Sequence, residues 1–251
     1  MMNLQNCKQW VKTNQHPAAK LLKKVFLNLR SFEIPATKVL FVPLRILHES
    51  ICNGMGASLR VFYWTPLFKT RLSGVSRRLY LYGGMPLIQG NLKIDIGNDC
   101  RISGQTTFSG RTSSNIQPLL KIGNNVGIGW QTTIAVGSRI IIGDNVRIAG
   151  KGFLAGYPGH PIDPESRARG LPETDDQVGD IILEQDVWLG TGVSVMKNVR
   201  IGKGTIVAAG SVVTHNLPAN VLAAGVPAKI VKSLTTSTTG HVLEAHKEKA
   251  A

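Results

Sequence analysis

One histidine stands in a stretch of the chain that has no regular periodicity. His160 lies between Gly159 and Pro161, within residues 155–170, which read AGYPGHPIDPESRARG. A neutral imidazole titrates near neutral pH, so it is a natural base for a hydroxyl group. Proline restricts the residue before it to extended backbone, and Pro161 therefore limits where this imidazole can point. The question is which elements place such a side chain.

Repeats of six residues lie on both sides of this stretch. From Leu183 to Pro218 the chain reads LEQDVW, LGTGVS, VMKNVR, IGKGTI, VAAGSV, VTHNLP. Every first position is aliphatic, and every fifth is Val, Thr, Ser or Leu. The same phase appears from Ile96, Ile122 and Ile142. Neither a helix nor a simple strand has this period, whereas hexapeptide repeats are typical of a β-helix.

The repeat predicts a prism in which each hexad forms one short strand and Gly, Asn or Asp takes the corner. First-position side chains point inward and stack on those of the coils above and below, about 4.8 Å apart. The small fifth residue fills the remaining corner of the interior. Cys100 occupies a fifth position, so we expect it in the core and not as a nucleophile. The three cysteines are far apart, which favours a reducing compartment without structural disulfides.

Three motifs resemble the left-handed parallel β-helix acyltransferases of the hexapeptide-repeat family, in particular the maltose, galactoside and nodulation-factor O-acetyltransferases. They are GHPIDPESR (159–167), DVWLGTGVSV (186–195) and AAGSVVTHNLPANVLAAGVPAKIVK (208–232). The resemblance implies an all-β, left-handed parallel β-helix over residues 92–232, with a catalytic loop at about 156–181. It also implies a homotrimer with acetyl-CoA and acceptor bound between adjacent prisms.

In that family a histidine deprotonates the acceptor hydroxyl, which then attacks the thioester of acetyl-CoA directly, and His160 matches this histidine. Glu173 and Asp163 are the two candidates for the carboxylate that orients the imidazole. An asparagine of the family aligns with Gly129, a departure that leaves the oxyanion donor open, and Gln131 can substitute. The rings of Trp130 and Tyr157 suit stacking on a sugar, and simple packing is the alternative for both.

The resemblance also indicates where acetyl-CoA would lie. Small residues let the pantetheine arm approach the backbone, and Lys229 and Lys232 stand where the family places basic residues for the phosphates. His215 takes the place of a frequent lysine. The alternative is that the small residues only shape corners, and no metal is expected. The matching positions are Trp188, Gly190, Thr191, Ala209, Gly210, Ser211, Thr214, His215, Lys229 and Lys232.

Positive charge is concentrated in the first part of the chain. Of the net +14, residues 1–90 carry thirteen Lys and Arg against two acids, which gives +11. Residues 18–30 form an amphipathic pattern with Lys20, Lys23 and Lys24 opposite an apolar face. Such a helix can lie on the anionic inner membrane, or it can pack its apolar face on the β-helix. No RNA-binding or zinc-finger pattern is present in the sequence, so nucleic acid is not expected.

We therefore expect an acetyl-CoA-dependent O-acetyltransferase for a sugar hydroxyl of a bacterial surface polysaccharide or its lipid-linked precursor. An acetyltransferase for a small free sugar, amino sugar or xenobiotic is the alternative, and a non-enzymatic β-helix scaffold is the second. The expected organisation is a basic helical cap (1–91), the β-helix (92–232) and a flexible tail (233–251). Without a signal-peptide or membrane-spanning pattern, the protein is expected in the cytoplasm, with peripheral membrane contact as an option.

Overall fold

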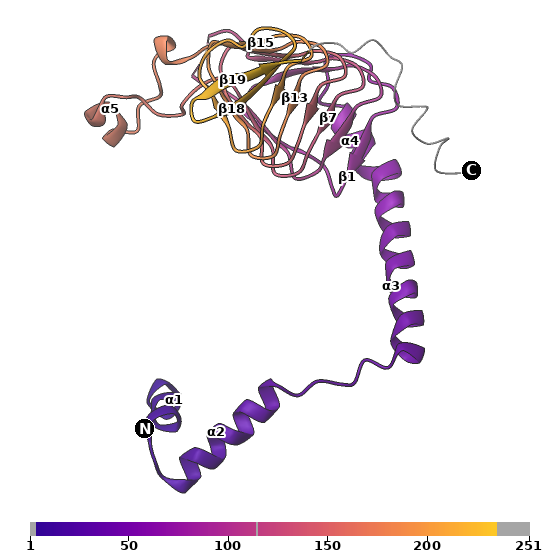
Figure 1. The fold of residues 1–251 in the computed structure, drawn as a ribbon, viewed down its shortest axis with the longest axis vertical. Helices are drawn as coiled ribbons and strands as arrows, with labels where there is room; N and C mark the ends of the chain where they lie inside the picture. The colour runs from indigo at the N-terminus through magenta and orange to yellow at the C-terminus, as the bar shows by residue number, and fades with distance from the viewer. Residues whose placement is uncertain (1–3, 114, 235–251) are drawn as a thin grey trace. The chain divides into compact units, whose positions relative to one another are not determined.

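The chain divides after Asn53 into two compact units. A computed structural model describes residues 4–113 and 115–234 (Figure 1). The tail expected to be flexible lies, from residue 235 onward, outside the described residues.

The first unit is helical. Helix α1 (Leu4–Thr13) contacts α2 (Pro17–Arg30), where Ala19 is fully buried. Helix α2 begins as its sequence indicates: Pro17 stands in the first turn, and His16 Nδ1 accepts a hydrogen bond from the backbone N–H of Ala18. The apolar side chains expected on one face of α2 are all exposed: Leu21, Leu22, Val25, Phe26 and Leu29.

Helix α3 (Lys38–Leu59) crosses the division between the two units, and none of its residues is buried. Its surface carries one ion pair, Arg45 to Glu49 at 2.7 Å. Among the described residues, no helix has both the length and the apolar character needed to cross a bilayer. A π-helical turn (Arg60–Trp64) and α4 (Thr65–Lys69) lead from α3 to the first strand.

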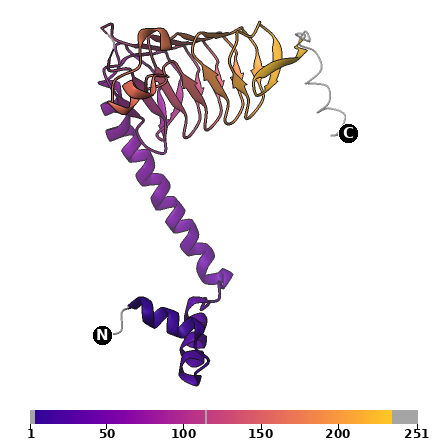
Figure 2. The same cartoon turned by 90° about the vertical axis from the view of Figure 1, so that its left-hand side faces the viewer.

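The second unit is a parallel β-helix whose successive strands turn from one sheet to the next (Figures 1 and 2). Within the described residues there are three such sheets, which we call A, B and C. Sheet A contains β1 (Tyr80–Tyr82), β4 (Arg101–Ser103), β7 (Gly127–Ile128), β10 (Arg147–Ile148), β13 (Trp188–Leu189), β16 (Ile206–Val207), β18 (Val221–Gly225) and β19 (Ala228–Ser233).

Sheet B contains β2 (Leu87–Gln89), β5 (Thr107–Gly110), β8 (Thr133–Val136), β11 (Phe153–Ala155), β14 (Ser194–Met196) and β17 (Val212–Val213). Sheet C contains β3 (Lys93–Ile96), β6 (Leu119–Ile122), β9 (Arg139–Ile142), β12 (Ile181–Leu183) and β15 (Val199–Ile201). One coil therefore takes one strand from each sheet, in the order A, B, C.

The first-position side chains of the repeat form the core, as the sequence predicted. Those of the six uninterrupted hexads are all buried: Leu183, Leu189, Val195, Ile201, Val207 and Val213. Cys100 lies in the same core, where burial raises the pKa of its thiol. A raised thiol pKa disfavours the thiolate, so this residue is a packing residue and not a nucleophile.

Asn and Asp residues hold one line of corners. Asn125, Asn145 and Asp186 all have positive φ, the left-handed conformation that Asn and Asp tolerate best after glycine. Their side chains are also bonded from coil to coil: Asn125 Nδ2 donates to Asn145 Oδ1, and Asn145 Nδ2 donates to Asp186 Oδ1, both at 2.9 Å.

The β-helix differs from the expectation at its first coil. Its strands begin at Tyr80, before the expected boundary at Leu92. Leu81 and Ile88 contribute to the core there, but they are seven residues apart because the turn contains Gly83 and Gly84, so the six-residue phase is lost. The chain as a whole is not all-β, since residues 4–69 are mostly helical and the loop after β11 carries a further helix.

The last coil ends in a reversal of the chain. Strand β18 pairs with β16 in parallel, and β19 then pairs with β18 antiparallel. Residues 221–233 thus form the final strands of sheet A, at the end of the β-helix.

Candidate active site

The loop that carries His160 leaves the β-helix at the edge between sheets B and C. It runs from the end of β11 to the start of β12 and contains α5 (Pro164–Ala168) and a 3-10 turn (Asp175–Gln177). Figure 1 shows α5 projecting away from the coils. His160 is exposed, and the preceding Gly159 has a φ of 79° that favours glycine. The imidazole is therefore presented to the outside of the prism.

Asp163 begins helix α5. Its Oδ2 accepts a hydrogen bond from the backbone N–H of Ser166 at 2.7 Å, which makes it the N-cap residue. The Ser166 hydroxyl and backbone N–H together lower the pKa of Asp163, so its carboxylate is ionised at neutral pH. Arg167 secures the same turn by donating to the carbonyl oxygens of Pro161 and Ile162 at 3.0 and 2.8 Å.

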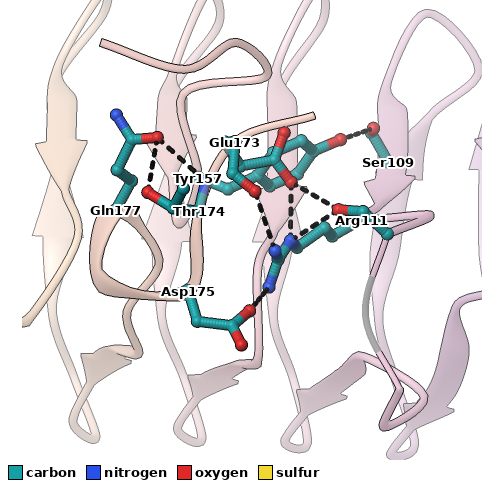
Figure 3. Close-up of polar contacts among 8 residues, drawn as sticks. Ser109, Arg111, Tyr157, Glu173, Thr174, Asp175 and Gln177 are labelled. Atoms are coloured by element: carbon teal, nitrogen blue, oxygen red, sulfur yellow. Dashed lines mark hydrogen bonds and ion pairs between the residues drawn. The ribbon is translucent and has the colours of Figure 1, made fainter. Parts of the chain in front are cut away.

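Glu173 forms a buried ion pair with Arg111, a residue of the coil (Figure 3). Nε of Arg111 lies 2.6 Å from Glu173 Oε1, and Nη2 donates to the Glu173 carbonyl at 3.0 Å. Ser113 Oγ donates to the same carboxylate oxygen at 2.9 Å. The exposed fractions of the two side chains are 6% for Arg111 and 5% for Glu173. This pair attaches the second half of the loop to the β-helix.

Arg111 also binds the exposed carboxylate of Asp175, at 2.6 Å from Nη1. Burial by itself would lower the pKa of Arg111, but the hydrogen bonds with Asp175 and Glu173 outweigh it and raise the pKa. The guanidinium is thus permanently charged, and an uncompensated charge at this depth would be costly.

Both candidate orienting carboxylates are therefore engaged elsewhere. Among the described side chains, no hydrogen bond joins His160 to Asp163 or to Glu173. Their proposed role in orienting the imidazole stays a prediction, and the contacts that the structure does show hold the loop itself.

Tyr157 anchors the start of the loop. Its hydroxyl lies 2.6 Å from Ser109 Oγ, and the side chain is partly buried beside the Arg111 cluster (Figure 3). Ser109 and Gly110 end strand β5, directly before Arg111. The same short segment of coil therefore holds both ends of the loop.

A second group of predicted site residues lies on the edge between sheets A and B. Backbone hydrogen bonds join its consecutive coils: Lys151 N to Trp130 O at 2.8 Å, Gly192 N to Gly150 O at 3.0 Å and Gly210 N to Thr191 O at 2.8 Å. The predicted residues brought together here are Trp130, Gln131, Thr191, Ala209 and Gly210. The acceptor and acetyl-CoA positions expected from sequence thus share one edge of the prism.

Trp130 and Gly129 show why this edge departs from the family pattern. The Trp130 indole lies against Gly150, and Lys151 Nζ is 5.1 Å from the ring centroid. A Cβ atom at Gly129 would stand 2.5 Å from the backbone nitrogen of Gly150 and 2.7 Å from the carbonyl carbon of Ala149. The coil therefore has no room for an asparagine at position 129 without a backbone shift.

Other predicted acetyl-CoA positions lie on the outer face of sheet A. Strand pairing places Trp188 opposite Ile206, Ile206 opposite Leu222, and Leu222 opposite Lys232. Lys229 is paired with Ala224 in the same sheet. Gly190 has no space for a side chain, since a Cβ there would lie 2.6 Å from the backbone nitrogen of Ala209. The sheet thus presents an aromatic ring, small residues and two lysines along one face.

Three predicted positions do not belong to that face. Ser211 is buried, and its Oγ accepts a hydrogen bond from the Gly225 N–H at 3.0 Å, so it supports the last coil. Thr214 and His215 follow β17 at the other edge, between sheets B and C, where Thr214 Oγ1 lies 2.8 Å from His215 Nδ1. Within the described chain, no group of three or more His, Cys, Asp or Glu could hold a metal ion.

Sequence reasoning missed Arg111, the residue that fixes the loop. Arg111 and Glu173 are 62 residues apart in the chain, and nothing local in either segment links them. The cap at Asp163 did have a signal, because Asp-Pro-Glu is a typical helix start.

Comparison with known proteins relates the repeat to a known family. Residues 180–215 match the family model described as "Bacterial transferase hexapeptide (six repeats)". This part of the β-helix is similar to the hexapeptide-repeat transferases. The family resemblance expected from the three motifs is thereby confirmed.

Two curated relatives are galactoside O-acetyltransferases. The enzyme of Lactococcus lactis is 37% identical over 113 residues, which are 45% of this chain and 49% of the relative. That of Escherichia coli is 35% identical over 115 residues, 46% of this chain and 54% of the relative. The chain thus spans about half the length of the curated relatives that it matches.

A solved structure shares the fold. AntD, an N-acyltransferase from Bacillus cereus, was solved in complex with dTDP and 3-hydroxybutyryl-CoA. It is 22% identical, with a TM-score of 0.56, and the match covers 75% of this chain and 95% of AntD. At this identity the likeness establishes the architecture alone.

Proposed function

We propose that the protein is an acetyl-CoA-dependent O-acetyltransferase that acts on a sugar hydroxyl. The observation that supports it most is the pair of edges just described. One edge projects a loop with an exposed histidine, and the other lines up small residues and an aromatic ring for a long, thin co-substrate. The galactoside O-acetyltransferases among the relatives carry out this class of reaction.

In the proposed reaction His160 acts as the general base. Its imidazole takes the proton of the acceptor hydroxyl while the oxygen attacks the thioester carbonyl of acetyl-CoA. The tetrahedral intermediate then collapses, the C–S bond breaks, and the imidazolium returns the proton to the CoA sulfur. The products are an acetyl ester of the sugar and free CoA, so no external oxidant or metal is needed.

The oxyanion of the intermediate needs a hydrogen-bond donor, which typically stabilises it by about 2.7–4 kcal/mol. Gly129 leaves the edge without the side-chain amide of the family. We assign this role to the side chain of Gln131, which is exposed on the same edge two residues further along. A backbone N–H of the edge is the alternative.

The complete site is proposed to form between copies of the chain. His160 leaves at the edge between sheets B and C, whereas Trp130, Thr191 and Gly210 line the edge between sheets A and B. The width of sheet B separates the two edges in one copy. A homotrimer, as the family resemblance implies, would place the loop of one copy against the A–B edge of the next.

Acetyl-CoA is proposed to lie along sheet A. Trp188, Gly190 and Ala209 would receive the pantetheine arm, since the backbone is accessible where side chains are small. Lys229 and Lys232 on β19 are exposed and would contact the nucleotide phosphates. Ser211 is buried and its hydroxyl accepts from the Gly225 N–H, so its contact with acetyl-CoA stays a prediction.

The acceptor is proposed to be a glycan of a bacterial surface polysaccharide or its lipid-linked precursor. The support is α2, which includes residues 18–30 and exposes six large apolar side chains together with Lys20, Lys23, Lys24 and Arg30. A helix of this kind suits the anionic cytoplasmic face of the inner membrane, where lipid-linked glycans are assembled. A small free sugar is the second candidate, favoured by the galactoside acceptors named in the relatives.

The test is release of CoA thiol from acetyl-CoA by the purified full chain, with free galactosides, polymeric glycans and lipid-linked glycans as acceptors. We expect His160→Ala to lower kcat by about 10²- to 10⁴-fold. His48→Ala, an exposed histidine of α3 with no assigned role in the site, is the control. Full turnover by the His160 variant would overturn the role of His160 as general base. Turnover with free sugars alone would overturn the proposal that the acceptor is a polymeric or lipid-linked glycan.

Membrane contact has a separate test. The full chain and a Leu22→Glu/Phe26→Glu variant are sedimented with vesicles of anionic and of neutral phospholipids. We expect binding to the anionic vesicles that falls in salt and is lost in the variant, because two charges then face the acyl chains. Equal sedimentation of both proteins would contradict the proposal.

A further inference from the structure

The outer face of sheet A carries a hollow toward its first coils, and Trp188 is the acetyl-CoA position that borders it. It has a volume of about 400 Å³ and lies among the strands from β1 to β13. Tyr82 borders it at one end and Trp188 at the other, with Gly127, Gly129 and Ala149 among its lining residues. The hollow therefore continues the face on which the acetyl-CoA positions lie, toward the first coils.

The hollow forms where glycines replace larger residues on the outer face of sheet A. Strand register places Gly127 between Arg101 on one neighbouring strand and Arg147 on the other. A Cβ at Gly127 would contact Cδ of Arg147 at 3.2 Å, so the stem of this arginine lies across the glycine. A Cβ at Gly129 would clash with the backbone of Ala149 and Gly150. The floor is thus open backbone, with an arginine on each side.

Neither arginine has a carboxylate partner among the described residues. Arg147 donates to neutral groups, the backbone carbonyl and the side-chain oxygen of Asn125, the latter at 3.0 Å. The guanidinium carbon of Arg101 lies 5.8 Å from the centroid of the Tyr80 ring, and its side chain is exposed. Within the described residues, neither guanidinium forms an ion pair.

Other arginines of the β-helix are different. Arg78, Arg139 and Arg200 each pair with a carboxylate of a neighbouring coil. Stacked coils normally supply such partners, because residues at equivalent positions lie about 4.8 Å apart. Arg101 and Arg147 are two coils apart, so their Cα atoms are separated by about 10 Å and their long side chains can reach one group between them.

We propose that this hollow binds an anionic group, a carboxylate or a phosphate, carried by the sugar acceptor. Two guanidiniums with free donors recognise such oxygens through charge-assisted hydrogen bonds. The exposed Trp188 ring borders the end of the hollow nearest the acetyl-CoA positions, and Tyr82 is held at the far end by donating to the Ile128 carbonyl at 3.1 Å.

This inference rests on the proposed sugar acetyltransferase activity and names the class of its acceptor. The lysines assigned to the CoA phosphates stand on β19, at the opposite end of sheet A from Arg101. Trp188 lies between the two basic groups. The positions therefore suit two different anions, one on each substrate.

The test compares acceptors that share one sugar and differ only in charge. Methyl galactoside is neutral, galacturonate supplies a carboxylate, and galactose 1-phosphate supplies a phosphate. We expect kcat/KM for at least one anionic acceptor to exceed that of the neutral one by about tenfold or more. Arg101→Ala should lower kcat/KM for the anionic acceptor by about 10- to 100-fold, through a higher KM. Arg101→Lys keeps the positive charge and should therefore retain part of the preference for the anionic acceptor.

Controls separate this inference from the proposed activity. Arg139→Ala removes an exposed arginine of sheet C and should leave kcat/KM unchanged for both the neutral and the anionic acceptors. If Arg101→Ala affects neutral and anionic acceptors equally, or raises only KM for acetyl-CoA, the inference is overturned. Direct calorimetric binding of galacturonate and galactose 1-phosphate to the full chain tests the hollow even if no sugar is acetylated. Absence of binding there, or binding unchanged in Arg101→Ala, also overturns it.

Discussion

The coils of the β-helix and the loop of residues 156–180 are held together in opposite ways. Each coil repeats the same contacts as its neighbours: an aliphatic side chain in the core, a small residue at the corner and a parallel ladder on each face. The loop repeats nothing. It depends on a few single contacts, above all the buried pair of Arg111 and Glu173.

This difference shows how a regular scaffold can carry an irregular site. A change in a coil is shared by the coils that stack on it, so it affects the stability of the whole prism. A change in a loop contact affects the loop alone and leaves the scaffold folded. Stability and activity should therefore respond to different residues, and the following variants test this separation in order of expected effect.

Arg111→Met should have the largest effect, because it leaves the Glu173 carboxylate buried without its cation. Removing one partner of a buried pair typically costs about 3–5 kcal/mol. We expect the loss to appear as opening of the loop, measured by hydrogen exchange of amides in residues 171–178. Arg139→Met breaks an exposed pair with Asp180 and should cost about 1 kcal/mol or less.

The double variant Arg111→Met/Glu173→Leu sharpens this test, because it leaves no buried charge. It should recover most of the lost protection. Equal and small effects of Arg111→Met and Arg139→Met would show that the loop does not depend on the buried pair.

Ile134→Ala should destabilise the whole prism. Ile134 is fully buried between the coils of sheet B, and Ile-to-Ala changes in cores cost about 2–5 kcal/mol. Chemical denaturation followed by circular dichroism measures the loss. Ile162→Ala in the loop is the matched control, since its side chain is 78% exposed and should change stability by about 0.5 kcal/mol or less. Similar losses for both would contradict the comparison.

The sequence predicts these two regions unequally. Hexad phase placed Leu189 and Val195 in the core and Cys100 in a corner, because one rule holds for every coil. The first coil does not follow the six-residue phase, since Leu81 and Ile88 are seven residues apart. In the loop, His160 could be singled out by its neighbours, but the contact of Arg111 with Glu173 could not. It forms only when the fold brings together two segments that have no local relation.

Asn145→Ala tests the corners with a smaller expected effect. Asn145 has a φ of 60°, and a left-handed residue other than glycine typically costs about 1–2 kcal/mol. The variant also loses the bonds to Asn125 and Asp186. Asn145→Gly loses the same bonds but adopts this φ freely, so its melting temperature should lie above that of the alanine variant. The reverse order would show that the side-chain bonds, not the backbone, decide the corner.

The smallest effect is expected from pH. The backbone N–H of Lys203 and the guanidinium of Arg200 bind Glu184 and lower its pKa. A carboxylate with a lowered folded-state pKa stabilises the protein above its ordinary pKa of about 4.3, and this contribution disappears as pH falls through the lower, folded value. The melting temperature of Glu184→Gln should therefore lie below that of wild type at about pH 7 and approach it at about pH 3. A constant difference would exclude the carboxylate charge as the cause.

Strand β19 also limits how one β-helix can stack on the end of another. Parallel coils present an open edge on which another coil can always be added, whether from the same chain or from a second molecule, and such growth leads to fibres. On sheet A that edge is occupied by a strand running the other way, with Lys229 and Lys232 exposed along it. Reversed direction and positive charge both oppose end-to-end stacking of β-helices at this edge, so the hairpin that would hold the CoA phosphates would also limit growth by stacking there.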